Sequence, residues 1–315
     1  MNIPQVRSDH MQRQHGFSSP RRVQDRLTII LFLLPAFVFF LFFIIYPIFR
    51  AGYFSLFNWN GLGPATVFTG LDNFKQILTD QVFMKGVLNC LLIVVLSLAI
   101  QLPLAMLLAI MVGRDLPGRV FFRTVFFMPY VISEVITAII WMSLFDPDPE
   151  RGFVNALLVL IPGVNPQNFL GDMNQVMACV FVVLTWKYFG LHMLLYMTGL
   201  QNIPKELEEA AMIDGANRWQ TIRSVTIPLL GSTIRTTVQL SVLGSLTQFP
   251  LIWIMTRGGP ANASEVMATY MYRYAFIRFQ LGYGSAVALV MLVICLIFSV
   301  VYLRLARQPD YLGSI

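Results

Sequence analysis

Polar side chains inside strongly apolar stretches are the residues of this sequence that could do chemistry. If these stretches cross a membrane, their polar groups are costly, and such groups usually mark a cavity or a solute route. Hydroxyls and aromatic faces suit a sugar, which presents OH groups and an apolar ring face. Seven candidates lie near mid-depth of three stretches: Glu134 and Thr137; Lys187 and Tyr188; and Ser241, Ser245 and Gln248.

Two other interpretations of these residues stay open. Ser and Thr in membrane helices commonly hydrogen-bond to a neighbouring helix without contacting a solute, which applies to Ser241 and Ser245. Glu134 and Lys187 carry opposite charges, so they could neutralise each other instead of contacting a solute. Transport that survives an exchange of their two charges would support the pair.

Motifs for catalysis and nucleotide binding are absent from the sequence. A Walker phosphate-binding loop needs Gly-Lys, and no lysine here follows a glycine. There is no His-Glu-x-x-His motif, Ser-His-Asp set or pair of catalytic carboxylates, and the three histidines are scattered. The three cysteines lie in separate apolar stretches, which argues against a disulfide framework or a metal cluster. We expect no enzymatic activity, no metal and no cofactor bound by this chain.

The composition indicates an all-α integral membrane protein. Hydrophobic residues make up 57% of the 315 residues, charged residues only 12%, and the mean hydropathy is +0.68. Pro35, Pro103 and Pro129 are expected to kink membrane helices. Six runs are long enough to cross about 30 Å of hydrocarbon: 27–49, 86–112, 119–145, 176–200, 229–256 and 282–305, between tails at 1–26 and 306–315.

The distribution of Lys and Arg predicts the orientation. With both termini in the cytoplasm, inside segments hold fourteen of the 22 basic residues, outside segments hold seven, and Lys187 lies within a span. This bias follows the positive-inside rule. It explains the formal charge of +6 without nucleic acid as a partner, and it places the polar loop 202–228 in the cytoplasm.

Loop 202–228 is predicted to form helix, turn, helix. Pro204 suits the first helical position and Asp214-Gly215 breaks the first helix. Asn217 and Gln220 resemble a capping box that opens a second helix, which Pro228 is expected to close. Trp219, Ile222 and Val225 share one face of that second helix.

The same loop carries a family resemblance. Glu209-Ala210-Ala211, then Gly215, then Val225-x-Ile227-Pro228 resembles the signature of the membrane-spanning permease subunits of binding-protein-dependent ABC importers. The two departures from that signature are conservative apolar exchanges. The resemblance implies the type I ABC importer permease fold and a loop that docks on a separate ATPase. The expected coupling residues are Glu206, Glu209, Ala210, Ala211, Asp214, Gly215 and Pro228.

The expected outer loops resemble the carbohydrate-importing branch of this family. The resemblance lies in residues 68–78, in the Thr-x-Gly-Gly-Pro segment of 256–276, and in 283–286. It implies a sugar substrate, an extracytoplasmic solute-binding protein, two ATPase subunits that use ATP and Mg, and a second permease subunit. The expected location is a bacterial or archaeal cytoplasmic (inner) membrane. A glycerol phosphate, polyol or polyamine permease and, more distantly, a secondary transporter are the alternatives.

Overall fold

The computed structural model describes residues 21–113 and 118–306. Most of the two expected tails, 1–20 and 307–315, lies outside the described residues, and so does Arg114. The chain divides into two compact units, Met1–Arg50 and Ala51–Ile315, which are described separately.

The first unit consists of one apolar helix that continues into the second unit. Its apolar side chains are exposed on all sides, and no residue in its most apolar segment is buried. A helix that is apolar all round suits a membrane. The helix begins at Arg21, earlier than the expected start at residue 27. Its parts are α1 (Arg21–Phe40), the π-helix η1 (Leu41–Ile45) and α2 (Tyr46–Phe54).

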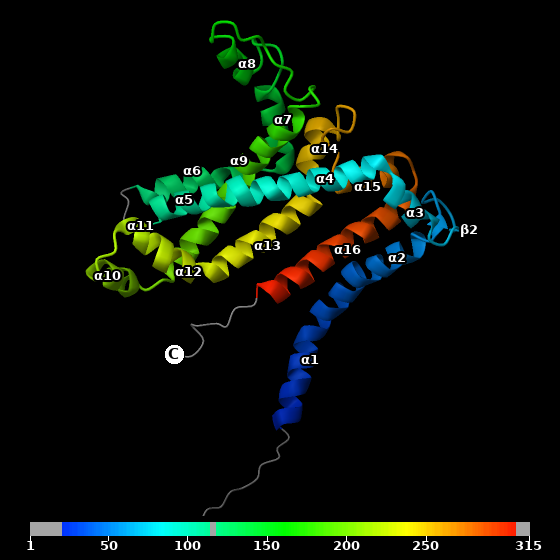
Figure 1. Cartoon of the computed structure of the whole chain (residues 1–315). Coiled ribbons are helices and arrows are strands. Elements are labelled where there is room, and N and C mark those ends of the chain that lie inside the picture. Colours follow the sequence, from blue (N-terminus) through cyan, green and yellow to red (C-terminus); the bar gives the residue numbers. More distant parts are fainter. Residues whose placement is uncertain (1–20, 114–117, 307–315) are drawn as a thin grey trace, which may run out of the picture. The chain divides into compact units, whose positions relative to one another are not determined.

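The second unit contains three further helices that are long and apolar enough to cross a membrane (Figure 1). Their bounds agree with the expected runs 86–112, 176–200 and 282–305 to within a few residues. The helices are α4 (Gln81–Leu96), continuous with η2 (Ser97–Gln101) and α5 (Leu102–Val112); α9 (Val176–Gln201); and α16 (Leu281–Leu305).

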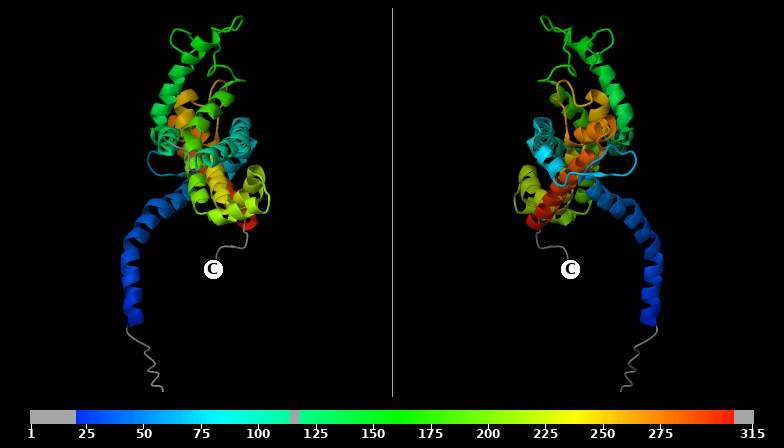
Figure 2. Two further views of the ribbon diagram at one scale, coloured as in Figure 1. Left: turned by 90° about the vertical axis from the view of Figure 1, so that its left-hand side faces the viewer. Right: turned by 90° about the vertical axis from the view of Figure 1, so that its right-hand side faces the viewer.

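The two remaining expected runs are bent helix pairs, which corrects the prediction of continuous helices over 119–145 and 229–256. The first pair, α6 (Arg119–Val131) and α7 (Glu134–Leu144), meets at 97°. The second pair, α13 (Gly231–Thr247) and α14 (Pro250–Thr256), meets at 41°. Figures 1 and 2 show α7 turning away from α6 and carrying the short helix α8 at its far end.

A proline lies near each of the two breaks. Pro129 lies two residues before the end of α6, and the chain is extended at Ile132 and Ser133. Gln248 is likewise extended, and Pro250 opens α14. A proline cannot donate a helical hydrogen bond, and its ring disfavours helical backbone in the residue before it.

Three π-helices end two residues before a proline: η1 before Pro47, η2 before Pro103 and η3 (Ile222–Thr226) before Pro228. The wider turn accommodates the carbonyl four residues upstream, which would otherwise clash with the proline ring. Pro228 therefore lies inside α12 (Ile227–Leu229), and the helical stretch ends at Leu229, one residue beyond the proline that was predicted to close it.

Short elements complete the second unit. Strands β1 (Phe57–Asn58) and β2 (Val67–Phe68) pair antiparallel, with Phe57 opposite Phe68. The short helices are α3 (Asp72–Thr79), α8 (Phe153–Leu158), α10 (Lys205–Ile213), α11 (Arg218–Thr221), α15 (Met267–Tyr272) and the π-helix η4 (Arg273–Ile277).

Helix α9 is the central packing element of the second unit. It packs against α5 and α6, and its Val180 and Val183 are fully buried. Gly190 permits the close approach of α6, because a Cβ at this position would lie 2.0 Å from the Phe126 carbonyl oxygen.

Candidate solute pathway and coupling loop

A cavity of about 330 Å³ lies among η2, α7, α9 and the break between α13 and α14. Its wall is apolar at Ile93, Leu184, Leu191 and Leu240. Polar and aromatic groups from all these elements also line it: Ser97, Gln101, Tyr130, Glu134, Tyr188, His192, Ser241, Ser245, Thr247 and Gln248. Such a mixture of apolar surface with a few polar groups is typical of a small-molecule site.

The structure brings five of the seven predicted pathway residues to this cavity: Glu134, Tyr188, Ser241, Ser245 and Gln248. Thr137 and Lys187 are not among the lining residues; they are buried, with 0% and 3% exposed. Glu134 is also not at the middle of a continuous helix, because it is the first residue of α7 after the break. Contact between any of these residues and a solute stays a prediction.

Sequence reasoning missed five of these polar and aromatic residues: Ser97, Gln101, Tyr130, His192 and Thr247. Three of them carried a usable signal. Ser97 and Gln101 lie one helical turn apart in an otherwise apolar stretch, and His192 lies one turn after Tyr188. The same rule that selected Ser241 and Ser245 would have selected them.

Lys187 and Glu134 have different partners, so the proposed pairing between them is not among the ion pairs of the described residues. The Lys187 ammonium donates to the carbonyl oxygens of Pro129 and Tyr130, each at 3.1 Å, and to that of Ile132. These carbonyls lie at the end of α6, where the break removes their helical donors. Lys187 therefore stabilises the broken helix from α9.

Glu134 is tied to α9 through a different residue. The Tyr188 hydroxyl donates to Glu134 Oε1 at 2.5 Å, which joins the start of α7 to the middle of α9. On α13, Ser245 Oγ donates to the Ser241 carbonyl at 2.8 Å. Serine back-bonding of this kind is common in helices and leaves the hydroxyl oxygen as an acceptor.

Four buried polar atoms of the cavity residues have no hydrogen-bond partner within the described parts of the chain: Glu134 Oε2, His192 Nδ1, Ser241 Oγ and Gln248 Nε2. Buried polar groups are nearly always hydrogen-bonded, so a cluster of exceptions needs an explanation. Together they offer acceptors and donors around one space. This arrangement can bind a molecule that carries several hydroxyl groups.

The polar loop 202–228 has the predicted helix, turn, helix form. Helix α10 follows Pro204, which is its N-cap and not its first residue. The chain turns after Asp214 at Gly215, whose φ is +90°. This left-handed backbone is one that glycine adopts readily. The capping box is also confirmed. The Gln220 N–H donates to Asn217 Oδ1 at 2.9 Å, and the Asn217 N–H donates to Gln220 Oε1 at 2.8 Å.

Glu208 joins the two helices of the loop. Glu208 is 3% exposed, and its Oε1 accepts a 2.8 Å hydrogen bond from the Thr226 hydroxyl in η3. The predicted coupling residues Glu206, Glu209 and Ala210 are exposed. They are therefore free to contact another protein, while Glu208 fixes the angle of the loop.

Large apolar side chains are also exposed on this loop. Leu207, Met212, Ile213 and Trp219 are 45%, 48%, 86% and 66% exposed. Trp219 thus does not pack inside the loop, although it shares a helical face with Ile222 and Val225. Exposed aromatic and aliphatic residues beside acidic ones are typical of a protein interface.

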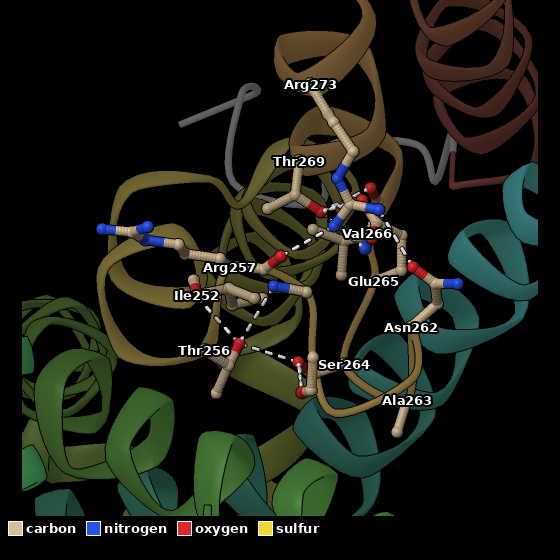
Figure 3. Close-up of polar contacts among 12 residues, drawn as sticks. Ile252, Thr256, Arg257, Asn262, Ala263, Ser264, Glu265, Val266, Thr269 and Arg273 are labelled. Atoms are coloured by element: carbon tan, nitrogen blue, oxygen red, sulfur yellow. Dashed lines mark hydrogen bonds and ion pairs between the residues drawn. The ribbon is translucent and has the colours of Figure 1, made fainter. Parts of the chain in front are cut away.

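The loop between α14 and α15 holds Glu265, a buried carboxylate that pairs with the half-buried Arg273 of η4 (Figure 3). Arg273 Nη2 lies 2.6 Å from Glu265 Oε2, and Glu265 Oε1 accepts from the Thr269 hydroxyl at 2.9 Å. Burial raises the pKa of the Glu265 carboxyl above its usual range, and Arg273 opposes that rise. Asn89 of α4 donates to the carbonyls of Ala263 and Glu265, which fixes this loop on the helices.

These features define a membrane permease, and the comparisons with known proteins agree. The chain belongs to the family of binding-protein-dependent transport system inner membrane components, which it matches over residues 101–310. This chain is thus a transport subunit, and members of this class are not enzymes.

Two relatives illustrate the range of solutes in the family. The multiple sugar-binding transport system permease protein MsmF of Streptococcus mutans is 32% identical over 267 residues, which cover 84% of this chain and 90% of MsmF. The sn-glycerol-3-phosphate transport system permease protein UgpA of Agrobacterium fabrum is 30% identical over 272 residues, which cover 86% and 92%.

A solved structure has the same fold. A chain of a bacterial ABC transporter involved in the import of the acidic polysaccharide alginate superposes with a TM-score of 0.80 at 25% identity. The match covers 92% of this chain and 98% of that chain. The fold is therefore that of an ABC importer permease.

Proposed function

We propose that this permease forms half of the translocation pathway for a sugar that an extracytoplasmic binding protein delivers. The observation that carries the proposal is the cavity, where donors and acceptors that have no partner among the described residues converge beside Tyr130 and Tyr188. Hydroxyl groups of a sugar match these atoms, and aromatic faces match its apolar side. The likeness to MsmF and to the alginate importer supports the same class of solute.

Energy for this transport comes from outside the chain. The sequence holds no Gly-Lys phosphate-binding loop, so a separate pair of ATPase subunits hydrolyses ATP. We assign their docking surface to the loop 202–228, with both termini and this loop in the cytoplasm. ATP binding would move two such loops together and switch the cavity from facing the cytoplasm to facing the outside. ATP can drive this switch only if it binds the two states with unequal affinity.

Uptake measurements on serine variants test the pathway. Ser241→Ala combined with Ser245→Ala is expected to lower uptake of a labelled sugar at least about tenfold, the effect of losing about 1.4 kcal/mol of binding. Thr198→Ala is the matched control, because Thr198 back-bonds to the Leu194 carbonyl at 3.0 Å but does not line the cavity. Equal uptake in the double variant and the control would refute the pathway.

Glycerol phosphate is the second candidate solute, because UgpA is as similar to this chain as several sugar permeases. Uptake of labelled oligosaccharides and of sn-glycerol 3-phosphate by cells that carry the complete transporter separates the two. Solute movement by the purified chain without an ATPase subunit would instead point to a secondary transporter.

A further inference from the structure

The charged groups around the cavity are unevenly placed. Among the described residues that line it, Glu134 carries the only carboxylate, and no lysine or arginine is present. The other polar lining groups are hydroxyls, amides and the His192 imidazole. A solute in this space therefore meets one acidic side chain and no permanently charged basic one on this wall.

Two contacts fix the Glu134 carboxylate at the cavity wall. Glu134 opens α7, so the helix break places it beside α9. The Tyr188 hydroxyl occupies Oε1, whereas Oε2 is buried and has no partner within the described residues. One carboxylate oxygen thus remains available to a hydroxyl or an amine of a solute.

Lys187 is the basic residue next to Tyr188 in the sequence, and its side chain is buried outside the cavity. It is 3% exposed, it does not line the cavity, and its ammonium is covered by the carbonyl oxygens of Pro129, Tyr130 and Ile132. All three ammonium protons have protein acceptors. Lys187 therefore offers no hydrogen bond to an anion in the cavity.

We propose that Glu134 makes this wall of the pathway select against anions, so that the solute is an uncharged or amino sugar and not a phosphate ester or a uronate. This inference rests on the proposed function of the cavity. Repulsion between like charges is strong in a partly dehydrated space, and an anion would also leave Glu134 Oε2 without a donor. The specificity thus differs from that of the solved relative, whose polysaccharide is acidic.

Thiol reagents of opposite charge test this inference without knowledge of the solute. Ser245→Cys is introduced into a chain whose Cys90, Cys179 and Cys295 are replaced by alanine, assembled with its ATPase and second permease subunits. The modification rates are measured with the cationic trimethylammonioethyl and the anionic sulfonatoethyl methanethiosulfonates, each divided by its rate with free 2-mercaptoethanol. We expect the cationic reagent to be favoured by about tenfold or more.

The decisive comparison is the same measurement after Glu134→Gln, which should bring the two normalised rates to within about twofold of each other. Asp72→Asn is the matched control, since Asp72 is an exposed carboxylate of α3 outside the cavity, and it should leave the preference unchanged. Modification without a charge preference, or a preference that survives Glu134→Gln, overturns the inference. No modification by either reagent instead refutes the cavity as a water-accessible pathway. Uptake of glycerol 3-phosphate or a uronate oligosaccharide by the full transporter would also overturn the inference.

Discussion

Gly215 shows how one residue can control the shape of the coupling loop. Its φ of +90° is a conformation that residues with a Cβ rarely adopt, whereas the space around a Cβ at this position is open. The requirement is therefore conformational and not steric. A left-handed backbone costs an ordinary residue about 1–2 kcal/mol, and asparagine tolerates it better than most.

We expect Gly215→Val to abolish uptake while the protein still inserts into the membrane, because a β-branched residue resists this backbone. Gly215→Asn should retain a substantial part of the activity. Gly52→Ala is the control, since Gly52 has open space and an ordinary helical backbone. Labelled-sugar uptake and solute-stimulated ATPase activity are the measurements. Equal activity of the valine and asparagine variants would show that the left-handed turn is not required.

Lys187 gives the second prediction at the scale of a residue. Lys187→Met removes the donors to three carbonyls at the end of α6, and each buried carbonyl left unpaired costs about 1–3 kcal/mol. We expect a clear drop in the thermal unfolding temperature of the purified protein in detergent. Lys187→Arg keeps several donors and should lose less. If both variants unfold at the same temperature as the wild type, Lys187 does not stabilise the helix break.

At the scale of elements, the sequence predicts where helices lie better than where they bend. Composition and length were sufficient for α9 and α16, whose bounds lie within a few residues of the prediction. The 97° bend between α6 and α7 was not foreseen, although Pro129 was expected to kink the chain. Proline weakens a helix locally, but the size of the bend depends on partners far along the sequence, such as Lys187.

The candidate site likewise contains residues that the sequence could predict and residues that it could not. Polar residues in apolar stretches identified five lining residues, because burial of a polar group is costly wherever it occurs. The partners of Lys187 could not be predicted, since they are backbone carbonyls more than fifty positions away. Glu208 could not be separated from Glu206 and Glu209 in the sequence, because its burial depends on how η3 folds back on α10.

The loop between α14 and α15 leads to a prediction about pH. Burial raises the pKa of Glu265, so the folded protein holds this proton more tightly than the unfolded chain does. The resulting stabilisation is complete below the ordinary pKa of a glutamate, about 4.3, and is lost as the pH rises through the raised pKa of the folded protein.

The unfolding temperature of the wild type should therefore fall relative to that of Glu265→Gln as the pH rises from about 4 toward neutral. The glutamine can keep the hydrogen bond from Thr269 without a charge that needs Arg273. Thermal unfolding of both proteins over this range measures the difference. If the unfolding temperature of the wild type instead rises relative to that of Glu265→Gln, the effect of Arg273 outweighs that of burial and lowers the pKa of Glu265.

At the scale of the whole molecule, the permease can be understood as a set of bent helices whose breaks meet at one cavity. The break after α6 supplies Glu134, the break after α13 supplies Gln248, and the π-helix η2 supplies Gln101. Irregular backbone inside a membrane is tolerated only where protein or a water-filled cavity satisfies its polar groups. The same irregularities that disturb the helices therefore place polar groups at the cavity.

The proposed assembly depends on apolar side chains that this chain exposes on a polar loop. Ile213 and Trp219 are 86% and 66% exposed, and truncation of a few such residues commonly removes most of an interface's binding energy. We expect Ile213→Ser combined with Trp219→Ser to weaken co-purification of the ATPase subunits by at least about tenfold, or about 1.4 kcal/mol. The second permease subunit should still co-purify, because the loop is separate from the membrane-spanning helices.

The matched control is Leu160→Ser, another highly exposed apolar residue, which lies after α8 and away from this loop. Loss of both partners in the double variant would indicate misfolding, and unchanged ATPase binding would mean that the docking surface lies elsewhere.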